Sequence, residues 1–231
     1  MRAIDALGLL GVNITVPHKE RTARLLKRQS AEARALGAVN CVIPRRGELF
    51  GDNTDARGLA DDLAALGAPV KGQTAIVIGA GGGAAAAILA LRRLGARRVV
   101  IANRTRRRAL NLAARFSAKR IEVRDLQELT DPALISDAAI VINATSVGLK
   151  SESYLPLAYE AARADCFFYD LIYAAAPTAF LRPALERGLP AADGAGMLLR
   201  QGALAFELFN GVKPPLEAMR EALFARLGRS G

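Results

Sequence analysis

Short apolar runs alternate with alanine- and leucine-rich stretches in the middle of the chain. Residues 74–78 (TAIVI) form an apolar run that stops at glycines, residues 84–94 have the composition of a helix, and residues 98–102 (RVVIA) are apolar again. Short apolar runs favour buried strands, whereas longer stretches rich in alanine and leucine favour helices. The pattern therefore predicts a strand, a helix and a second strand.

The same alternation continues downstream. Apolar runs at 140–143 (IVIN) and 167–171 (FFYDL) predict two more strands, and residues 106–116 and 177–187 predict helices. Strands that alternate with helices are typical of a parallel sheet covered by helices. We therefore expect an α/β fold with a Rossmann-type parallel sheet.

The two ends of the chain have a different pattern. The N-terminal part predicts a strand at 11–17 ended by Pro17, a helix at 19–36, two strands within 37–51 that turn at 45–47, and a helix at 54–66 that Thr54 or Asp55 could cap. The C-terminal part predicts helices at 196–209 and 215–227. We expect two domains: a Rossmann domain at 57–193 and a smaller α/β domain built from 1–56 and 194–231.

Composition and charge narrow the classes of function. The chain has 231 residues, of which 52% are hydrophobic, as in a folded globular protein, and a net charge of +10. Eight arginines and no acid lie at 92–108, so the rest of the chain carries only +2. The basicity is local and no aromatic residues interleave it, which disfavours a nucleic-acid binder.

The remaining composition argues against metal, disulfide and membrane chemistry. The only histidine is His18 and the only cysteines are Cys41 and Cys166, so we expect no metal site and no disulfide framework. The longest uncharged run, 72–91, holds five glycines, which favours strand, turn and helix over a membrane span. The N-terminus shows no secretory pattern, so we expect a cytoplasmic protein without a membrane partner.

A glycine-rich motif predicts a dinucleotide site. Residues 79–84 (GAGGGA) fit G-x-G-x-x-G/A directly after a predicted strand and before a predicted helix. In this context Gly79 permits the tight turn, Gly81 lets the backbone approach the pyrophosphate, and the helix N-terminus offers unpaired N–H groups. The next strand ends in residues 103–106 (NRTR) without the acid that would bind the ribose of NAD. Because a guanidinium pairs well with phosphate, Arg104 and its neighbours favour NADP.

Two polar clusters are candidates for the chemistry. In residues 13–19 (NITVPHK), alternation puts Asn13 and Thr15 on one face of a strand, and Lys19 follows just past the proline. Residues 51–55 (GDNTD) lie at the head of a predicted helix. If Lys19 and Asp55 meet at one substrate oxygen, the lysine can supply a proton while the carboxylate orients it. From these residues alone, a solvent-facing lysine and a helix-capping aspartate remain the alternative.

Together the motifs NITVPHK, GAVN, GDNTD, GAGGGA, NRT, NATSVG, YDLIY and GAGMLLRQGALAFE, in this order, resemble the shikimate dehydrogenase family along nearly the whole chain. The resemblance implies a two-domain enzyme that reversibly reduces 3-dehydroshikimate to shikimate with NADPH, in aromatic amino-acid biosynthesis. It implies a small-molecule substrate and a monomer or homodimer.

The resemblance also assigns residues by position. Lys19 and Asp55 match the catalytic pair, with Asp55 also facing the substrate. The residues that match substrate-binding positions are Thr15, Asn40, Tyr173 and Gln201. The residues that match cofactor-binding positions are Gly79, Ala80, Gly81, Gly82 and Gly83 at the pyrophosphate, Asn103, Arg104, Thr105 and Arg108 at the adenosine phosphate, and Leu171 and Gly194 near the nicotinamide.

Family members ordinarily begin with a strand that carries a Ser-x-Ser element, then a helix and a second strand, all upstream of the position that Met1 matches. The resemblance therefore implies that the substrate domain of this chain lacks its usual N-terminal part. It also implies that the chain lacks the clamp for the substrate carboxylate. Two further interpretations stay open: a quinate/shikimate dehydrogenase that prefers NAD, and a truncated non-catalytic NADP-binding relative.

Overall fold

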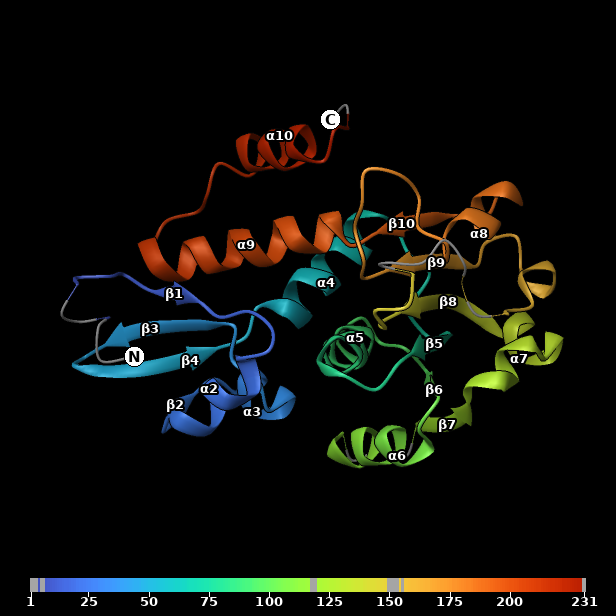
Figure 1. Ribbon diagram of the computed structural model, residues 1–231, viewed down its shortest axis with the longest axis horizontal. Coiled ribbons are helices and arrows are strands. Elements are labelled where there is room, and N and C mark those ends of the chain that lie inside the picture. The colour runs from blue at the N-terminus through green and yellow to red at the C-terminus, as the bar shows by residue number, and fades with distance from the viewer. Residues whose placement is uncertain (1–3, 5–6, 117–119, 149–153, 155, 230–231) are drawn as a thin grey trace.

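Two β-sheets with helices packed against them make up the computed structural model, which describes residues 4, 7–116, 120–148, 154 and 156–229 (Figure 1). The larger sheet is parallel, in the order β10–β9–β8–β5–β6–β7. Its strands are β5 (Thr74–Ile78), β6 (Arg98–Asn103), β7 (Ile121–Asp125), β8 (Ala138–Asn143), β9 (Phe167–Asp170) and β10 (Ala191–Asp193). Read from β7 to β10, this is the 3-2-1-4-5-6 order of doubly wound dinucleotide-binding sheets. The predicted Rossmann-type sheet is confirmed.

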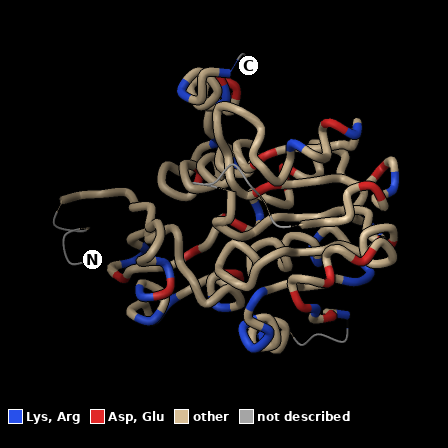
Figure 2. The backbone as a smooth tube through the Cα atoms, turned by 45° about the vertical axis from the view of Figure 1, so that its right-hand side comes forward, with Lys and Arg blue, Asp and Glu red and all other residues tan. Residues whose placement is uncertain are grey.

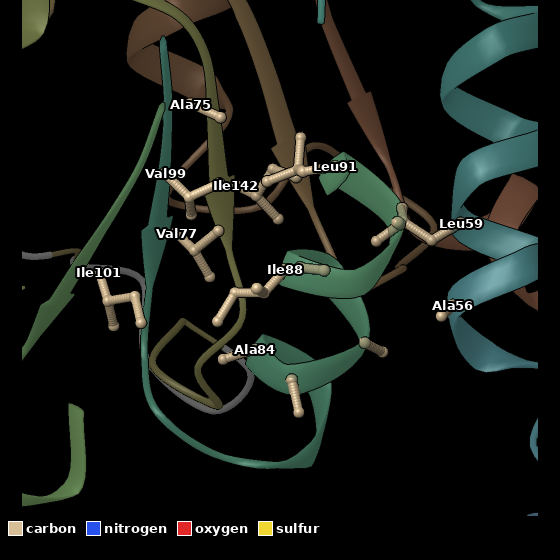
Figure 3. Close-up of a cluster of buried hydrophobic side chains, with 14 of the residues drawn as sticks. Ala56, Leu59, Ala75, Val77, Ala84, Ile88, Leu91, Val99, Ile101 and Ile142 are labelled. Atoms are coloured by element: carbon tan, nitrogen blue, oxygen red, sulfur yellow. The ribbon is translucent and has the colours of Figure 1, made fainter. Parts of the chain in front are cut away.

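Helices bury both faces of the larger sheet, which explains why β5 and β8 are apolar at nearly every position. The helices that follow its strands are α5 (Gly82–Arg93), α6 (Arg106–Arg115), α7 (Pro132–Ser136) and α8 (Arg182–Glu186). In Figure 3, Val77 and Ile142 of the sheet face Ile88 and Leu91 of α5, and all four side chains are fully buried. Close packing of this cluster fixes α5, and with it the glycine-rich turn that precedes it.

The smaller sheet has four strands in the order β1–β3–β4–β2, of which only β2 and β4 run parallel. Its strands are β1 (Val12–Asn13), β2 (Arg28–Gln29), β3 (Cys41–Arg45) and β4 (Glu48–Asp52). Arg46 and Gly47 join β3 to β4, and both have positive φ, as a two-residue hairpin turn requires. The predicted pair of strands turning at 45–47 is confirmed.

Two long helices connect the sheets. The remaining helices are α2 (Lys19–Leu25), α3 (Ala31–Leu36), α4 (Asp55–Ala65), α9 (Ala195–Asn210) and α10 (Leu216–Arg226), of which α10 packs on α9. Helix α4 packs along α9 and also against α5, so it touches both parts of the fold (Figure 1). The two-domain α/β class is thereby confirmed, while the domain bounds stay a prediction. Among the described residues, no helix has both the length and the apolar character needed to cross a membrane.

Three predicted elements were wrong in extent. The helix expected at 19–36 is two helices separated by β2, because Leu26 is extended and Ser30 starts α3 by accepting a hydrogen bond from the Ala33 N–H. The strand expected at 11–17 pairs only at Val12–Asn13 and ends before a cis Val16–Pro17 bond. The helix expected at 177–187 is helical only at Arg182–Glu186.

Some short elements had no clear signal in the sequence. Strand β7 (IEVRD) mixes charged and apolar residues because it lies at the sheet edge and every residue is half-buried. Strand β10 has three residues and α7 has five, too few for a periodic pattern.

The contact between α4 and α9 depends on the absence of a side chain at Gly58. A Cβ there would lie 2.7 Å from the backbone N of Gln201, closer than real Cβ atoms come to backbone. We expect Gly58→Ala to force the helices apart and lower the free energy of unfolding by about 1–3 kcal/mol, measured by urea denaturation.

Gly202→Ala is the matched control, because Gly202 is also helical but a Cβ there would meet only the end of Met219 at 3.7 Å. We expect it to leave stability unchanged or to raise it by up to about 1 kcal/mol through helix propensity. Equal effects of the two variants would contradict the close-approach explanation.

Candidate active site

Residues from both parts of the fold line one cavity of about 230 Å³. The lining residues are Asn13, Ile14, Thr15, Lys19, Asn40, Asp55, Leu171, Tyr173, Gly194, Met197, Leu198 and Gln201. The cavity brings together the residues expected at the catalytic and substrate-binding positions, and also the two expected beside the nicotinamide. They come from segments separated by more than a hundred residues, so this convergence is a property of the tertiary structure.

Lys19 and Asp55 form an ion pair inside this cavity. Each is the first residue of its helix, α2 and α4, and the Lys19 Nζ lies 2.7 Å from Asp55 Oδ2. Their side chains are only 25% and 16% exposed. The N-terminal end of α4 carries partial positive charge, which further stabilises the Asp55 carboxylate. The pair therefore presents an oriented ammonium group to the cavity.

Asn40 connects Asp55 to the elements around it. Its side-chain amide donates to Asp55 Oδ1 and to Thr54 Oγ1, each at 2.9 Å, and lies 3.4 Å from Gln201 Oε1. The side-chain oxygen Oδ1 of Asn40 accepts from the Thr54 N–H at 2.9 Å. Both oxygens of Asp55 are thus held, one by Lys19 and the other by Asn40.

The expected cap of α4 was wrong. Thr54 occupies the N-cap position but makes no side-chain capping bond, because its hydroxyl accepts from Asn40 instead. Asn53 holds this end of the helix: its side-chain oxygen accepts from the Asp55 N–H at 2.9 Å, and its amide donates to the Ala38 carbonyl. Sequence reasoning assigned Asn53 no role, although its place inside the dense polar run at 51–55 was the available signal.

The glycine-rich turn has the geometry that a pyrophosphate needs. Gly79 follows β5 with a φ of +116°, and a Cβ there would lie 3.0 Å from the Ala144 carbonyl oxygen. Gly81 is the N-cap residue of α5, and a Cβ on Gly81 or Gly82 would meet nothing within 4 Å. The N-terminal end of α5 therefore borders open space at Gly81 and Gly82, and the first turn of a helix has N–H groups that suit a phosphate.

The next turn of the sheet is basic. Strand β6 ends at Asn103, whose amide donates to the Thr105 carbonyl at 2.9 Å, and Thr105 is the N-cap residue of α6. Arg104 and Arg108 are exposed on either side of this cap. Arg106 is partly neutralised by Asp125 at 3.4 Å. Exposed guanidinium groups after the second strand of such a sheet suit a 2′-phosphate.

Leu171 joins the glycine-rich turn to the cavity. A Cβ on Gly83 would lie 2.9 Å from Leu171 Cδ1, and a Cβ on Gly194 would lie 2.4 Å from the Leu171 carbonyl oxygen. Leu171 also lines the cavity that holds Lys19. The candidate cofactor site and the candidate substrate site therefore share a wall, as transfer between two bound molecules requires.

Buried Asp170 fixes the turn that carries Leu171 and Tyr173. Its carboxylate accepts from the Asn143 side-chain amide at 2.9 Å, the Ile172 N–H at 3.0 Å and the Thr178 hydroxyl at 2.6 Å. Burial raises the pKa of Asp170 to about 6, although these hydrogen bonds act in the opposite direction.

The C-terminal tail is tied to the same turn. Arg229 pairs with Asp193, the residue before Gly194, and also donates to the carbonyl of Ala174, the residue after Tyr173. The Ala174 N–H in turn lies 3.4 Å from Asp193 Oδ2. No pattern in the sequence pointed to this contact, because its partners lie 36 and 55 residues apart.

Both cysteines are buried, as expected of apolar filling residues. Burial raises the pKa of Cys41 and of Cys166 to about 12, so both are protonated thiols at neutral pH and poor nucleophiles. Within the described part of the chain, no group of three or more His, Cys, Asp or Glu residues could hold a metal ion.

The fold and these two adjoining sites define a class: a two-domain, NADP-dependent oxidoreductase with a lysine–carboxylate pair at its substrate cavity. Family models agree along the chain. "Shikimate dehydrogenase substrate binding domain" matches residues 1–42, "Shikimate / quinate 5-dehydrogenase" matches 62–155, and "Shikimate 5'-dehydrogenase C-terminal domain" matches 194–224. The chain belongs to the shikimate dehydrogenase family.

Relatives and solved structures cover nearly the whole chain. A shikimate dehydrogenase (NADP(+)) of Symbiobacterium thermophilum is 39% identical, over 97% of this chain and 78% of the relative. One from Thermus thermophilus is 43% identical, over 94% of this chain and 79% of the relative. The crystal structure of a T. thermophilus shikimate 5-dehydrogenase in complex with NADP(H) and shikimate is similar with a TM-score of 0.80 and 42% identity, over 92% of this chain and 77% of that one.

The raised pKa of Asp170 predicts a specific dependence of stability on pH. An aspartate ordinarily has a pKa near 3.8, so between about pH 4 and pH 6 the folded protein holds a proton that the unfolded chain has lost. The contribution of Asp170 to the free energy of unfolding therefore falls as the pH rises, by up to about 3 kcal/mol in total. Asp170→Asn removes it.

The measurement is urea denaturation of the wild type and of Asp170→Asn at pH 4.5 and pH 7. We expect the variant to gain stability relative to the wild type at the higher pH. A difference that stays constant across this range would mean that Asp170 does not hold a proton in the folded protein.

Proposed function

We propose that this chain catalyses the reversible reduction of 3-dehydroshikimate to shikimate with NADPH. The observation that carries the proposal is the 2.7 Å pair of Lys19 and Asp55 in a cavity that shares Leu171 with the glycine-rich turn. The names of the relatives, and the NADP(H) and shikimate in a similar structure, support the same substrate and cofactor.

Lys19 and Asp55 divide the proton chemistry between them. NADPH, when bound, supplies the hydride that reduces the substrate carbonyl. The Lys19 ammonium donates a proton to the carbonyl oxygen as negative charge develops on it, and Asp55 holds that ammonium in place. In the reverse direction the same pair accepts the proton from the substrate hydroxyl. A positioned acid of this kind contributes about 10² to 10⁴ in rate.

The other polar residues of the cavity position the substrate ring. Thr15, Tyr173 and Gln201 offer hydroxyl and amide groups to its hydroxyls. Asn40 has a second task, since its amide already donates to Asp55 and Thr54. We infer that Asn40 also keeps Asp55 oriented toward Lys19.

The cofactor residues follow the two turns of the larger sheet. The proposed pyrophosphate turn consists of Gly79, Ala80, Gly81, Gly82 and Gly83. The proposed adenosine-phosphate residues are Asn103, Arg104, Thr105 and Arg108. The proposed nicotinamide residues are Leu171 and Gly194, because both line the cavity and Leu171 also lies against the glycine-rich turn.

The domain bounds, the oligomeric state, the cellular location and the partners are also proposals. The substrate domain consists of 1–56 and 194–231 and the NADP domain of 57–193, so the first boundary falls just after the first two residues of α4. The chain acts as a monomer or homodimer in the cytoplasm, on a small molecule, without nucleic acid or membrane.

A single assay tests the proposed function. The purified chain is given shikimate or quinate with NADP or NAD, and the absorbance of the reduced nicotinamide is followed. We expect reduction of NADP with shikimate, because the basic turn after β6 favours the 2′-phosphate. Reduction chiefly with quinate and NAD would contradict the interpretation of Arg104 and Arg108. NADP binding without turnover in any combination would indicate a non-catalytic NADP-binding protein.

Replacing Lys19 by Ala tests its role in the chemistry. We expect kcat to fall by about 10² to 10⁴, because the proton donor is lost, while the affinity for NADP stays within about twofold. Exposed Lys71, which lies outside the cavity, provides the control variant Lys71→Ala with unchanged kinetics. Unchanged turnover in Lys19→Ala would remove Lys19 from the mechanism.

A further inference from the structure

A second cavity, of about 580 Å³, lies at the end of the smaller sheet where β2 meets the β3–β4 hairpin. Its lining residues are Lys27, Arg28, Gln29, Arg34, Arg45, Arg46, Glu48 and Phe50. It shares no lining residue with the active-site cavity, and it has more than twice that cavity's volume. A volume between about 300 and 1,000 Å³ is typical of pockets that hold small molecules.

The lining of this cavity is strongly basic. Five of its eight lining residues are Lys or Arg and one is an acid, so the lining carries a net charge of +4. In Figure 2, Lys and Arg positions lie among Asp and Glu positions at the end of the molecule near the N-terminus, which holds the smaller sheet. This cluster lies outside the arginine-rich segment 92–108, so the cofactor turn does not explain it.

Most of these cations have no acidic partner. The only carboxylate in the lining, Glu48, pairs with Arg28 at 2.6 Å. Lys27, Arg34 and Arg46 make no ion pair with any described residue, and neither does Arg45, whose guanidinium lies 4.7 Å from the centre of the Phe50 ring. The four cations around this cavity that have no acidic partner among the described residues repel one another, and a bound anion would relieve that repulsion.

The β3–β4 hairpin holds one of these cations in an uncommon backbone conformation. Arg46 has a φ of +52°, a left-handed conformation that is uncommon for residues other than Gly, Asn and Asp. An arginine in this conformation costs about 1–2 kcal/mol relative to glycine. The hairpin turn accounts for this backbone conformation, and the residue that occupies it is an arginine that lines the basic cavity.

We propose that this cavity binds a polyphosphate group, carried by a small molecule or present as inorganic polyphosphate. Guanidinium and ammonium groups pair with phosphate oxygens through charge-assisted hydrogen bonds. A triphosphate ester such as ATP carries about four negative charges at neutral pH, one on each of its two inner phosphates and about two on the terminal phosphate. This charge matches the four cations that have no acidic partner among the described residues. A single phosphate leaves about two of them unpaired.

The proposal is independent of the enzymatic function, because it concerns different residues and a different ligand. The test is isothermal titration calorimetry of the full chain at low ionic strength, with inorganic tripolyphosphate, ATP, orthophosphate and adenosine as titrants. Each titration is run with and without saturating NADP. We expect tripolyphosphate and ATP to bind, orthophosphate to bind at least tenfold more weakly, adenosine not to bind, and NADP to leave these affinities unchanged.

The variant Lys27→Gln/Arg46→Asn tests the location. Both residues are exposed and make no ion pair with a described residue, and asparagine tolerates the left-handed backbone at position 46, so the fold should be kept. We expect tripolyphosphate affinity to fall at least tenfold. Arg45→Gln, which removes a third cation and leaves the turn intact, should also weaken binding.

Lys213→Gln/Arg226→Gln is the matched control, because it removes the same charge from exposed positions outside the cavity. It should retain the wild-type affinity. Several results would overturn the proposal: an equal loss of affinity in the control, competition by NADP, or no binding of either triphosphate. Equal affinity for tripolyphosphate and ATP would assign the site to the phosphate chain, and tighter binding of ATP would assign it to a nucleotide.

Discussion

Close packing of α4 on α9 governs both the shape of the active-site cavity and its attachment to the larger sheet. Asp55 begins α4 and Gln201 lies on α9, so the spacing of these two helices sets the width of the cavity. Gly58 permits that spacing near the cavity. Farther along, buried Asp62 of α4 accepts from the Tyr169 hydroxyl at 2.7 Å and from Arg200 at 3.1 Å. The same helix pair therefore links the substrate cavity to the larger sheet.

Buried hydrogen bonds, more than packing alone, hold the reactive groups of this protein. Asn40 and Thr54 are almost fully buried, and their polar atoms bond to each other and to Asp55. Leaving such groups unpaired costs about 1–3 kcal/mol each, so the network strongly favours a single arrangement. Buried Asp170 fixes the turn on the opposite wall of the cavity in the same way. Both walls of the site are preorganised before any ligand binds.

The excess of positive charge separates into groups with different surroundings. In the segment 92–108, Arg93 pairs with Glu32, and Arg98 pairs with Glu122 and Asp137, so part of this charge is used within the fold. Arg104 lies exposed beside the crevice at the carboxyl edge of the sheet. The cavity at the other end of the molecule keeps four cations without an acidic partner among the described residues. The net charge of +10 on this chain is therefore divided among separate local clusters of basic residues.

Features that depend on neighbours along the chain could be predicted from the amino-acid sequence. These include the apolar strands and helices of the larger sheet, the glycine-rich turn after β5, the missing acid after β6, and the motifs that mark the family. Local sterics and burial impose each of them, so each leaves a local pattern. The three-dimensional packing was needed to show that Lys19 and Asp55 meet at 2.7 Å, that Asn40 bridges Asp55 to Thr54, and that Arg229 reaches the turn beyond Tyr173. These contacts join distant segments, and the geometry of helix and sheet packing, which no local pattern encodes, brings them together.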